Sequence, residues 1–178
     1  MGTGTLDEKQ RRYCDVITSS GNSLLSVLGD VLDFAKIESG RIDLENVNFD
    51  LHDLITDVIN VHKELATQRR NRIYADISDE LMNSFNGDPT RIRQILNNLI
   101  GNSNKFTEGG AIAMTARPVN KGLSSKTTVE FVISDTGVGI PDATRDKLFQ
   151  PFIQGDSSMT RKFGGSGLGL VICEHLVN

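Results

Sequence analysis

The chain has 178 residues, of which 38% are hydrophobic and 24% charged, and its formal net charge is −4. This composition is ordinary for one globular domain with a helical extension, and it argues against nucleic-acid binding through bulk positive charge. No signal peptide opens the chain and no apolar run approaches the ~20 residues of a membrane-spanning helix, so we expect a cytoplasmic protein or the soluble part of a receptor.

Residues 6–39 have the periodicity of one long helix. Apolar side chains recur there at spacings of three and four, and a stripe this long favours a partner helix in a hairpin or dimer bundle. The alternative is that the helix packs on its own domain. The stripe consists of Tyr13, Ile17, Leu24, Leu25, Val27, Leu28, Val31, Leu32, Phe34 and Ala35.

The middle of the chain predicts two further helices and a strand. After an extended segment at 46–50, Asp50 is a good N-cap for a helix with a buried face extending to Leu65. Alternating apolar residues at 73–78 indicate a half-buried strand. Asp88 followed by Pro89 predicts the start of another helix, which continues to about Lys105.

The last third of the sequence predicts a β-hairpin and two helices. Residues 111–117 and 128–134 suit two antiparallel strands, Pro141 begins a short helix to about Phe149, and residues 150–162 read as a mobile loop. An apolar run from Leu168 begins a final helix. We expect an α+β fold, a two-layer α/β sandwich whose helices cover one face of a mixed, mostly antiparallel sheet.

A glycine-rich stretch, Phe163–Leu170, precedes that final helix. A glycine-rich loop that leads into a helix N-terminus is a ready anion site, because free N–H groups and the helix dipole point at the same place. The stretch lacks the lysine of a Walker A loop and the glycine spacing of the dinucleotide fingerprint. A phosphate-bearing ligand bound in another way is predicted, with an ordinary loop as the alternative.

Amides and a lysine form one stripe on the helix after Asp88. Asn98, Asn102 and Lys105 lie four and three residues apart, although asparagine is a poor residue for a helix interior. Amide oxygens can complete the shell of a hydrated Mg²⁺, and a lysine can bind phosphate. The alternative is a polar face in contact with solvent.

An apolar strand ends in the run Asp135-Thr-Gly-Val-Gly139. A carboxylate beside glycines can accept a hydrogen bond from an exocyclic amine such as that of adenine. Asp-Thr-Gly after apolar residues is also the signature of aspartic proteases, which need two such carboxylates. The chain has one Asp-Thr-Gly, and a protease would leave the asparagine stripe and the glycine stretch without a role.

Four segments together resemble, in order and separation, the N, G1, F and G2 boxes of sensor histidine kinases. The resemblance covers nearly the whole chain, with Ser103 and Ser166 as mild departures, and the run from Leu32 to Gly40 is most similar to hybrid-type kinases. It implies a Bergerat-type ATP-binding fold of the GHKL superfamily. The segments are 88–107, 135–140, 148–154 and 164–170.

The resemblance also implies ATP and Mg²⁺ as ligands and a role for each matched residue. Asn102 would bind Mg²⁺, Asn98 would be the catalytic residue near the phosphates, and Asp135 would hold adenine. Residues 155–163 would form a nucleotide lid, with Phe149 and Phe152 packed at its base or in the core. The other nucleotide-binding residues would be Lys105, Phe106, Gly137, Gly139, Ile140, Arg161 (or Lys162), Gly165, Ser166, Gly167, Leu168 and Gly169.

Two domains follow from the resemblance. Residues 1–45 would be the second helix of a dimerisation and phosphotransfer hairpin, and residues 46–178 a catalytic domain without its usual C-terminal strands. His52, His62 and His175 lack the setting of the phosphoacceptor histidine, and we expect surface or packing roles for them. Cys14 and Cys173 have no metal-ligand spacing and are expected to be reduced thiols.

The implied function is transfer of the γ-phosphoryl group of ATP to a histidine absent from this chain. Its partners would be the hairpin that carries that histidine and a response regulator or receiver domain, with a homodimer in the parent protein. One alternative is a GHKL-type ATPase, which Asn98 disfavours because it replaces the usual catalytic glutamate. The other is a nucleotide-sensing or partner-docking module without catalysis.

Overall fold

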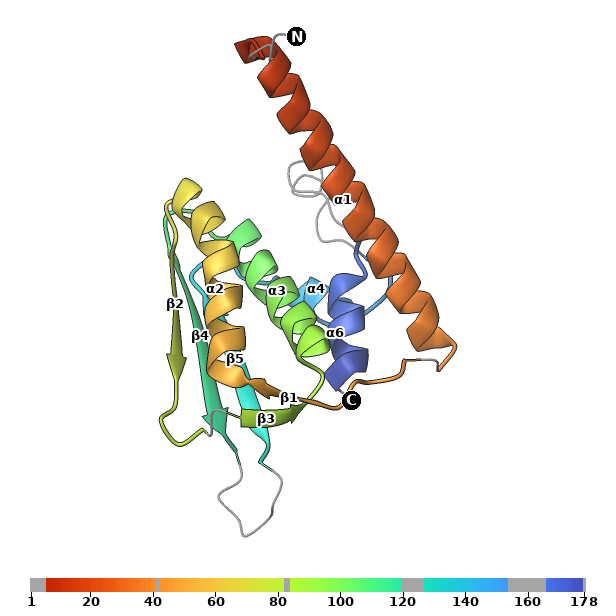
Figure 1. Cartoon of the computed structure of the whole chain (residues 1–178), viewed down its shortest axis with the longest axis vertical. Coiled ribbons are helices and arrows are strands. Elements are labelled where there is room, and N and C mark those ends of the chain that lie inside the picture. The colour runs from red at the N-terminus through yellow and green to blue at the C-terminus, as the bar shows by residue number, and fades with distance from the viewer. Residues whose placement is uncertain (1–5, 41, 82–83, 120–126, 154–165, 178) are drawn as a thin grey trace, which may run out of the picture.

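A computed structural model describes residues 6–40, 42–81, 84–119, 127–153 and 166–177. The elements lie in successive layers: a sheet, then helices α2 and α3, then α6, and outermost the long helix α1 (Figure 1). The predicted α/β sandwich with helices on one face of the sheet is confirmed.

The main sheet has three strands in the order β2-β4-β5. β2 (Arg72–Ile77) runs parallel to β4 (Ala111–Pro118), and β4 pairs antiparallel with β5 (Val129–Asp135), so that Met114 lies opposite Ile133. The predicted hairpin of the last two strands is correct. Because side chains alternate along a strand, this register turns Met114 and Ala116 toward the helices.

A second, two-stranded sheet joins the starts of two helices. β1 (Val47–Asp50) pairs antiparallel with β3 (Ser84–Gly87), with Phe49 opposite Phe85. The sequence does not predict β3, because four residues give too short an alternation to recognise. Each strand leads directly into a helix, so this sheet fixes where α2 and α3 begin (Figure 1).

Helices α2 (Leu51–Gln68) and α3 (Pro89–Phe106) begin at the predicted caps. Oδ1 of Asp50 accepts from the N–H of Asp53 at 3.0 Å, and Oδ1 of Asp88 accepts from the N–H of Arg91 at 2.9 Å. Each cap satisfies an N–H that the first turn leaves unpaired. The core between these helices and the sheet contains Leu51, Leu54, Ile55, Val58, Leu81, Leu96, Ile100, Met114 and Ala116.

Two shorter helices follow β5. α4 is limited to Asp142–Arg145, so the predicted helix from Pro141 to Phe149 is wrong in length. After Arg145 the backbone continues in turns. α6 (Gly169–Val177) begins where the apolar run predicted a helix, and it buries Val171, Ile172 and Cys173.

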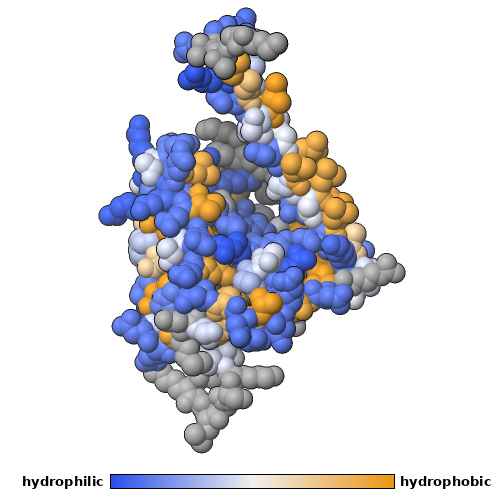
Figure 2. Space-filling model, in the orientation of Figure 1, coloured by the Kyte–Doolittle hydropathy of each residue, from blue (hydrophilic) through white to orange (hydrophobic). Residues whose placement is uncertain are grey.

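The long helix α1 (Glu8–Glu38) has 31 residues, and none of them is buried. Its C-terminal half lies beside α6, while the other half extends away from the rest of the molecule (Figure 1). Its apolar stripe stays exposed over much of its length (Figure 2). None of the described helices is sufficiently long and apolar to cross a bilayer.

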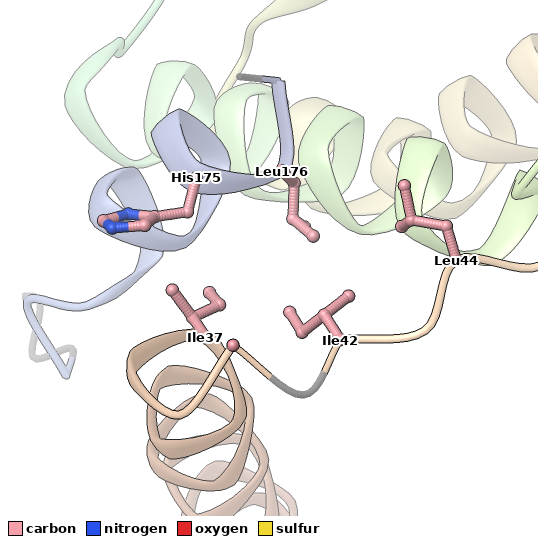
Figure 3. A pocket seen from close by; sticks show the side chains of 6 residues that line it. Ile37, Ile42, Leu44, His175 and Leu176 are labelled. Atoms are coloured by element: carbon pink, nitrogen blue, oxygen red, sulfur yellow. The ribbon is translucent and has the colours of Figure 1, made fainter.

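An apolar hollow of about 280 Å³ lies between the end of α1, the linker to β1 and α6. Ile37 and Ile42 point toward Leu176 in this hollow (Figure 3). The other lining residues are Gly40, Leu44 and His175, so the hollow contains no residue with a predicted nucleotide-binding role.

Candidate functional site

The C-terminal half of α3 carries the amides and the lysine that the sequence singled out. The side chains of Asn98, Asn102 and Lys105 are all partly buried. Burial lowers the pKa of Lys105 below its ordinary value of 10.5, and its Nζ lies 5.0 Å from the centroid of the Phe106 ring. The stripe therefore lies at the edge of the packed interior.

The run from Asp135 to Gly139 meets the end of α3. Oδ2 of Asp135 accepts from the Ser103 hydroxyl at 3.0 Å, and its Oδ1 accepts from the N–H of Gly137 at 3.0 Å. The N–H of Val138 donates to the carbonyl oxygen of Phe106 at 3.3 Å. The Asp135 side chain keeps one side open to solvent, so the carboxylate is oriented and still accessible.

Gly137 lies too close to the backbone of α3 for any side chain. A Cβ at this position would lie 2.4 Å from the carbonyl oxygen of Phe106 and 2.8 Å from Oγ1 of Thr107. Contacts below 3.0 Å do not occur between such atoms, so only glycine fits without a shift of the backbone. The run after β5 and the end of α3 are thus in direct backbone contact.

The described part of the glycine-rich stretch also lies on α3. A Cβ at Gly169 would lie 2.4 Å from both Nδ2 and Oδ1 of Asn98. Gly167 has a φ of +71°, in the left-handed region that favours glycine. Two segments that are distant in sequence therefore meet on α3: the Asp135 run at its C-terminal end and Gly169 at Asn98.

Ser166 links the glycine-rich stretch to α1. Its hydroxyl donates to Oδ2 of Asp30 at 2.6 Å and accepts from the N–H of Leu168 at 3.2 Å. Nearby, Nη1 of Arg91 forms an ion pair of 3.1 Å with Oδ1 of Asp33. These contacts hold the C-terminal half of α1 on the domain.

The thiol of Cys173 lies between two turns of α3. Its Sγ accepts from Nδ2 of Asn98 at 3.5 Å and donates to the carbonyl oxygen of Ile95 at 3.9 Å. Burial raises the pKa of the thiol to about 11, against a smaller opposite effect of the Asn98 bond. The thiol therefore keeps its proton at neutral pH.

A buried polar network supports the end of α3. Nδ2 of Asn71 donates to Oδ1 of Asn104 and to the carbonyl oxygen of Thr107, each at 2.9 Å, and its Oδ1 accepts from the N–H of Gly110 at 3.0 Å. Nδ2 of Asn104 and Oγ1 of Thr107 are buried and find no partner among the described residues. Asn71 thus fixes the turn between α3 and β4.

The remaining predicted site residues are distributed as follows. Asn102 makes no side-chain hydrogen bond within the described part of the chain. Gly139 has a φ of +70°, and Ile140 is 54% exposed.

Phe149 and Phe152 are exposed rather than core residues, and the Phe152 ring contacts Phe34 of α1 edge to face. Outside the described residues lie Arg161, Lys162, Gly165 and the predicted lid at 155–163.

Three residues of the site carried no functional prediction. In the sequence Ser103 stands out only as a departure from the family pattern, and no motif connects Asp30 or Cys173 to the site. Their partners are Asp135, Ser166 and Asn98, on elements far away in sequence. A single sequence gives no signal for such contacts.

The family comparison agrees with this arrangement. Residues 87–178 match the family model described as "Histidine kinase-, DNA gyrase B-, and HSP90-like ATPase". This range contains α3, the Asp135 run and the glycine-rich stretch.

Curated relatives share most of this chain. It is 39% identical over 174 residues to the signal transduction histidine-protein kinase BarA of Escherichia coli, with 97% of this chain covered. It is 34% identical over 177 residues to the autoinducer 2 sensor kinase/phosphatase LuxQ of Vibrio vulnificus, with 96% covered. The matched regions are only 19% and 20% of those proteins, so the chain spans about a fifth of their length.

Solved structures have the same fold. Full-length ShkA in complex with AMPPNP is similar with a TM-score of 0.77 and 34% identity, over 97% of this chain and 34% of that one. The catalytic domain of histidine kinase ThkA has a TM-score of 0.59 at 28% identity, over 75% of this chain and 80% of that one. The chain belongs to the family of histidine kinase-, DNA gyrase B- and HSP90-like ATPases, as a catalytic ATP-binding domain of the histidine kinase type.

Proposed function

We propose that this chain binds ATP with Mg²⁺ and transfers the γ-phosphoryl group to a histidine that another segment or protein supplies. The observation that carries the proposal is that the Asp135 run and Gly169 both contact the C-terminal half of α3. Helix α3 thus brings together the oriented carboxylate of Asp135, two amides, a lysine and the N-terminus of α6, which begins at a glycine. The similar ShkA structure is a complex with AMPPNP, which agrees with a nucleotide ligand.

The Asp135 end of the site is proposed to hold the adenine base. Ser103 and Gly137 orient the carboxylate, and its exposed side can accept from the exocyclic amine of the base. Gly139 has open space where a side chain would be and so leaves room for the ring, while Gly137 lets the Asp135 run lie against α3. Exposed Ile140 can cover one face of the ring.

The side of α3 that carries Asn98, Asn102 and Lys105 is proposed to hold the phosphates. Lys105 supplies a positive charge, and the N-terminus of α6 at Gly169 supplies N–H groups and the positive end of a helix dipole. Residues 165–168 and Arg161 are proposed as further phosphate contacts. Asn98 lies against Gly169 and so beside the reacting group.

Asn102 is proposed as the protein ligand of Mg²⁺. Among the described residues no group of three or more histidine, cysteine, aspartate or glutamate side chains could hold a metal. The available donors are amide oxygens, and the partly buried Asn102 has no competing hydrogen bond in the described part of the chain. Mg²⁺ accepts such a ligand, because it keeps several waters and binds phosphate oxygens, whose charge it neutralises.

The proposed transfer forms one bond and breaks one bond. The lone pair of an imidazole nitrogen forms the new P–N bond, the bond from the γ-phosphorus to the bridging oxygen breaks, and ADP leaves with that electron pair. The chain's part is to position the nucleotide and to stabilise the developing charge. Asn98 has no basic group to activate water, which disfavours plain ATP hydrolysis.

The domain division remains part of the proposal. Residues 1–45 would be the second helix of a dimerisation and phosphotransfer hairpin, since the exposed stripe of α1 suits a helical partner. Residues 46–178 would be the catalytic domain. A homodimer and a response regulator or receiver domain are the proposed partners of the parent protein.

Calorimetry with the ATP analogue AMPPNP, with and without Mg²⁺, tests nucleotide binding. Asp135→Ala should weaken binding about tenfold or more, as expected for a lost hydrogen bond to a charged group. Asn102→Ala should abolish the gain in affinity from Mg²⁺. Asn86→Ala is the matched control, because Asn86 pairs with Asn48 in an exposed position before the start of α3, whereas the proposed site lies on its C-terminal half. Folded wild-type protein that does not bind would refute the proposal.

A transfer assay separates the kinase from a docking module. The chain is mixed with [γ-³²P]ATP and a separate hairpin that carries a phosphoacceptor histidine, and acid-labile label on the hairpin is measured. A kinase domain should label it, and an Asn98→Ala variant should not. Nucleotide binding without any labelling would favour the non-catalytic module.

A further inference from the structure

Asn98 lies between two residues of the same face of α6. Gly169 and Cys173 are four residues apart, and positions with this spacing lie on one side of a helix. The Asn98 carboxamide fills the space where a Gly169 side chain would be, and its Nδ2 reaches the sulfur of Cys173 at 3.5 Å. The carboxamide is therefore confined by a backbone on one side and a thiol on the other.

Within the described residues the carboxamide makes one hydrogen bond, through its nitrogen. Oδ1 of Asn98 has no hydrogen-bond partner within the described residues. The two ends of an amide have opposite hydrogen-bonding character, so a flip would place a donor where an acceptor now lies. The sulfur decides between these two orientations, because Gly169 approaches both ends equally, at 2.4 Å for its ideal Cβ.

The thiol is itself fixed. It donates to the carbonyl oxygen of Ile95 at 3.9 Å, three residues before Asn98 on α3. Because the thiol proton is donated to that carbonyl, the lone pairs of the sulfur are available to accept from Nδ2 of Asn98. The raised pKa of Cys173 agrees with a thiol that keeps this proton at neutral pH.

We propose that Cys173 is a positioning residue, which holds Nδ2 of Asn98 so that Oδ1 faces the phosphate end of the site. This inference rests on the proposed kinase function and adds a residue to it. An acceptor oxygen there suits a metal-bound water or the N–H of an incoming imidazole, whereas a flipped amide would present N–H groups. The ordinary alternative is that Cys173 only fills space in the core.

Three variants separate positioning from packing. Cys173→Ala removes the hydrogen bonds and some volume. Cys173→Ser restores a group that can both donate and accept. Val171→Ala is the matched control, because Val171 is buried on the same helix with 2% exposure and has no polar side-chain atom to offer Asn98. All are assayed for kcat and for KM of Mg-ATP in the transfer reaction, with thermal unfolding alongside.

Cys173→Ala should lower kcat about tenfold with little change in KM. A change of this size is expected when one hydrogen bond is lost in the transition state. Cys173→Ser should restore kcat to within about twofold, since it replaces the same bonds. Val171→Ala should lower Tm and leave kcat unchanged. If Cys173→Ala behaves as Val171→Ala does, or if folded Cys173→Ser does not recover, the proposal is wrong.

Nuclear magnetic resonance tests the positioning without nucleotide or activity. The side-chain amide signals of Asn98, assigned by their loss in Asn98→Asp, should report a rigid group in the ¹⁵N-labelled wild-type chain and in Cys173→Ser. In Cys173→Ala they should report faster motion. Equal rigidity in Cys173→Ala would overturn the proposal, even where transfer activity supports the kinase function. An inactive wild-type chain with the predicted signals would refute only the kinase function.

Discussion

Ser166 and Asp30 are joined by a hydrogen bond of 2.6 Å across 136 positions of sequence. Ser166 belongs to the glycine-rich stretch at the phosphate end of the proposed site, and Asp30 belongs to α1. The same half of α1 binds Arg91 and Gln94 through Asp33, with a Gln94 Nε2 to Asp33 Oδ2 distance of 2.7 Å. The conformation of the glycine-rich stretch is thus tied to the docking of α1.

Removal of the Asp30 carboxylate should strengthen nucleotide binding. A negative charge beside a phosphate site repels the ligand, and at this partly buried position the effect is roughly 1 kcal/mol, or about fivefold in affinity. We expect Asp30→Ala to bind AMPPNP more tightly in calorimetry, with a smaller gain at high salt because of screening. Asp15→Ala, an exposed acid in the other half of α1, is the control and should change nothing. Weaker binding of AMPPNP by Asp30→Ala would contradict this prediction and would show that the docking of α1 favours nucleotide binding.

Much of the fold could be predicted from the sequence because its signals are local. The caps at Asp50 and Asp88, the hairpin of β4 and β5 and the start of α6 each depend on a few neighbouring residues. The stripe on α3 could be recognised for the same reason, since helical spacing places its residues on one face.

What the sequence could not predict depends on contacts between distant segments. Strand β3 is stable only because β1 pairs with it, and four residues leave no periodicity of their own. The helix expected to reach Phe149 ends at Arg145. The bond of Asn98 to Cys173 arises from packing of α6 on α3, which no local pattern encodes.

Replacement of Gly137 by alanine should impair the adenine end of the site. Its Cβ would lie 2.4 Å from a backbone oxygen, so the Asp135 run or the end of α3 must move. We expect Gly137→Ala to weaken AMPPNP binding at least about tenfold in calorimetry, the cost of a misplaced hydrogen bond to a carboxylate. Gly29→Ala is the control: no atom lies within 4 Å of that Cβ, and helix propensity favours alanine by about 1 kcal/mol. Unchanged affinity in Gly137→Ala would contradict the close contact.

Loss of the Asn71 side chain should destabilise the fold. It would leave buried Oδ1 of Asn104, the carbonyl of Thr107 and the N–H of Gly110 without their partner. We expect Asn71→Ala to lower the free energy of unfolding by about 2–4 kcal/mol in urea titrations, since each unsatisfied buried group costs about 1–3 kcal/mol. Asn86→Ala removes an exposed amide pair and should cost under about 0.5 kcal/mol. Similar losses in both variants would contradict this role of Asn71.

His62 should make stability fall below neutral pH. It lies between α2 and α3, where its Nε2–H donates to Oδ1 of Asn97 at 3.1 Å. Burial lowers the pKa of His62 below its ordinary value of 6.5, against an opposite and smaller effect of the Asn97 bond. The unfolded chain therefore binds more protons than the folded one as pH falls below about 6.5, and the free energy of unfolding decreases in that range.

A glutamine in place of His62 should remove that part of the pH dependence. His62→Gln keeps an N–H that can reach Asn97 and has no proton to gain, so urea titrations at pH 7, 6 and 5 should give a flatter series than the wild type. Asn97→Ala should give a steeper series, because the bond that supports the charged form of His62 is lost and the pKa falls further. Parallel curves for the three proteins would mean that the pH dependence of stability in this range arises elsewhere in the chain.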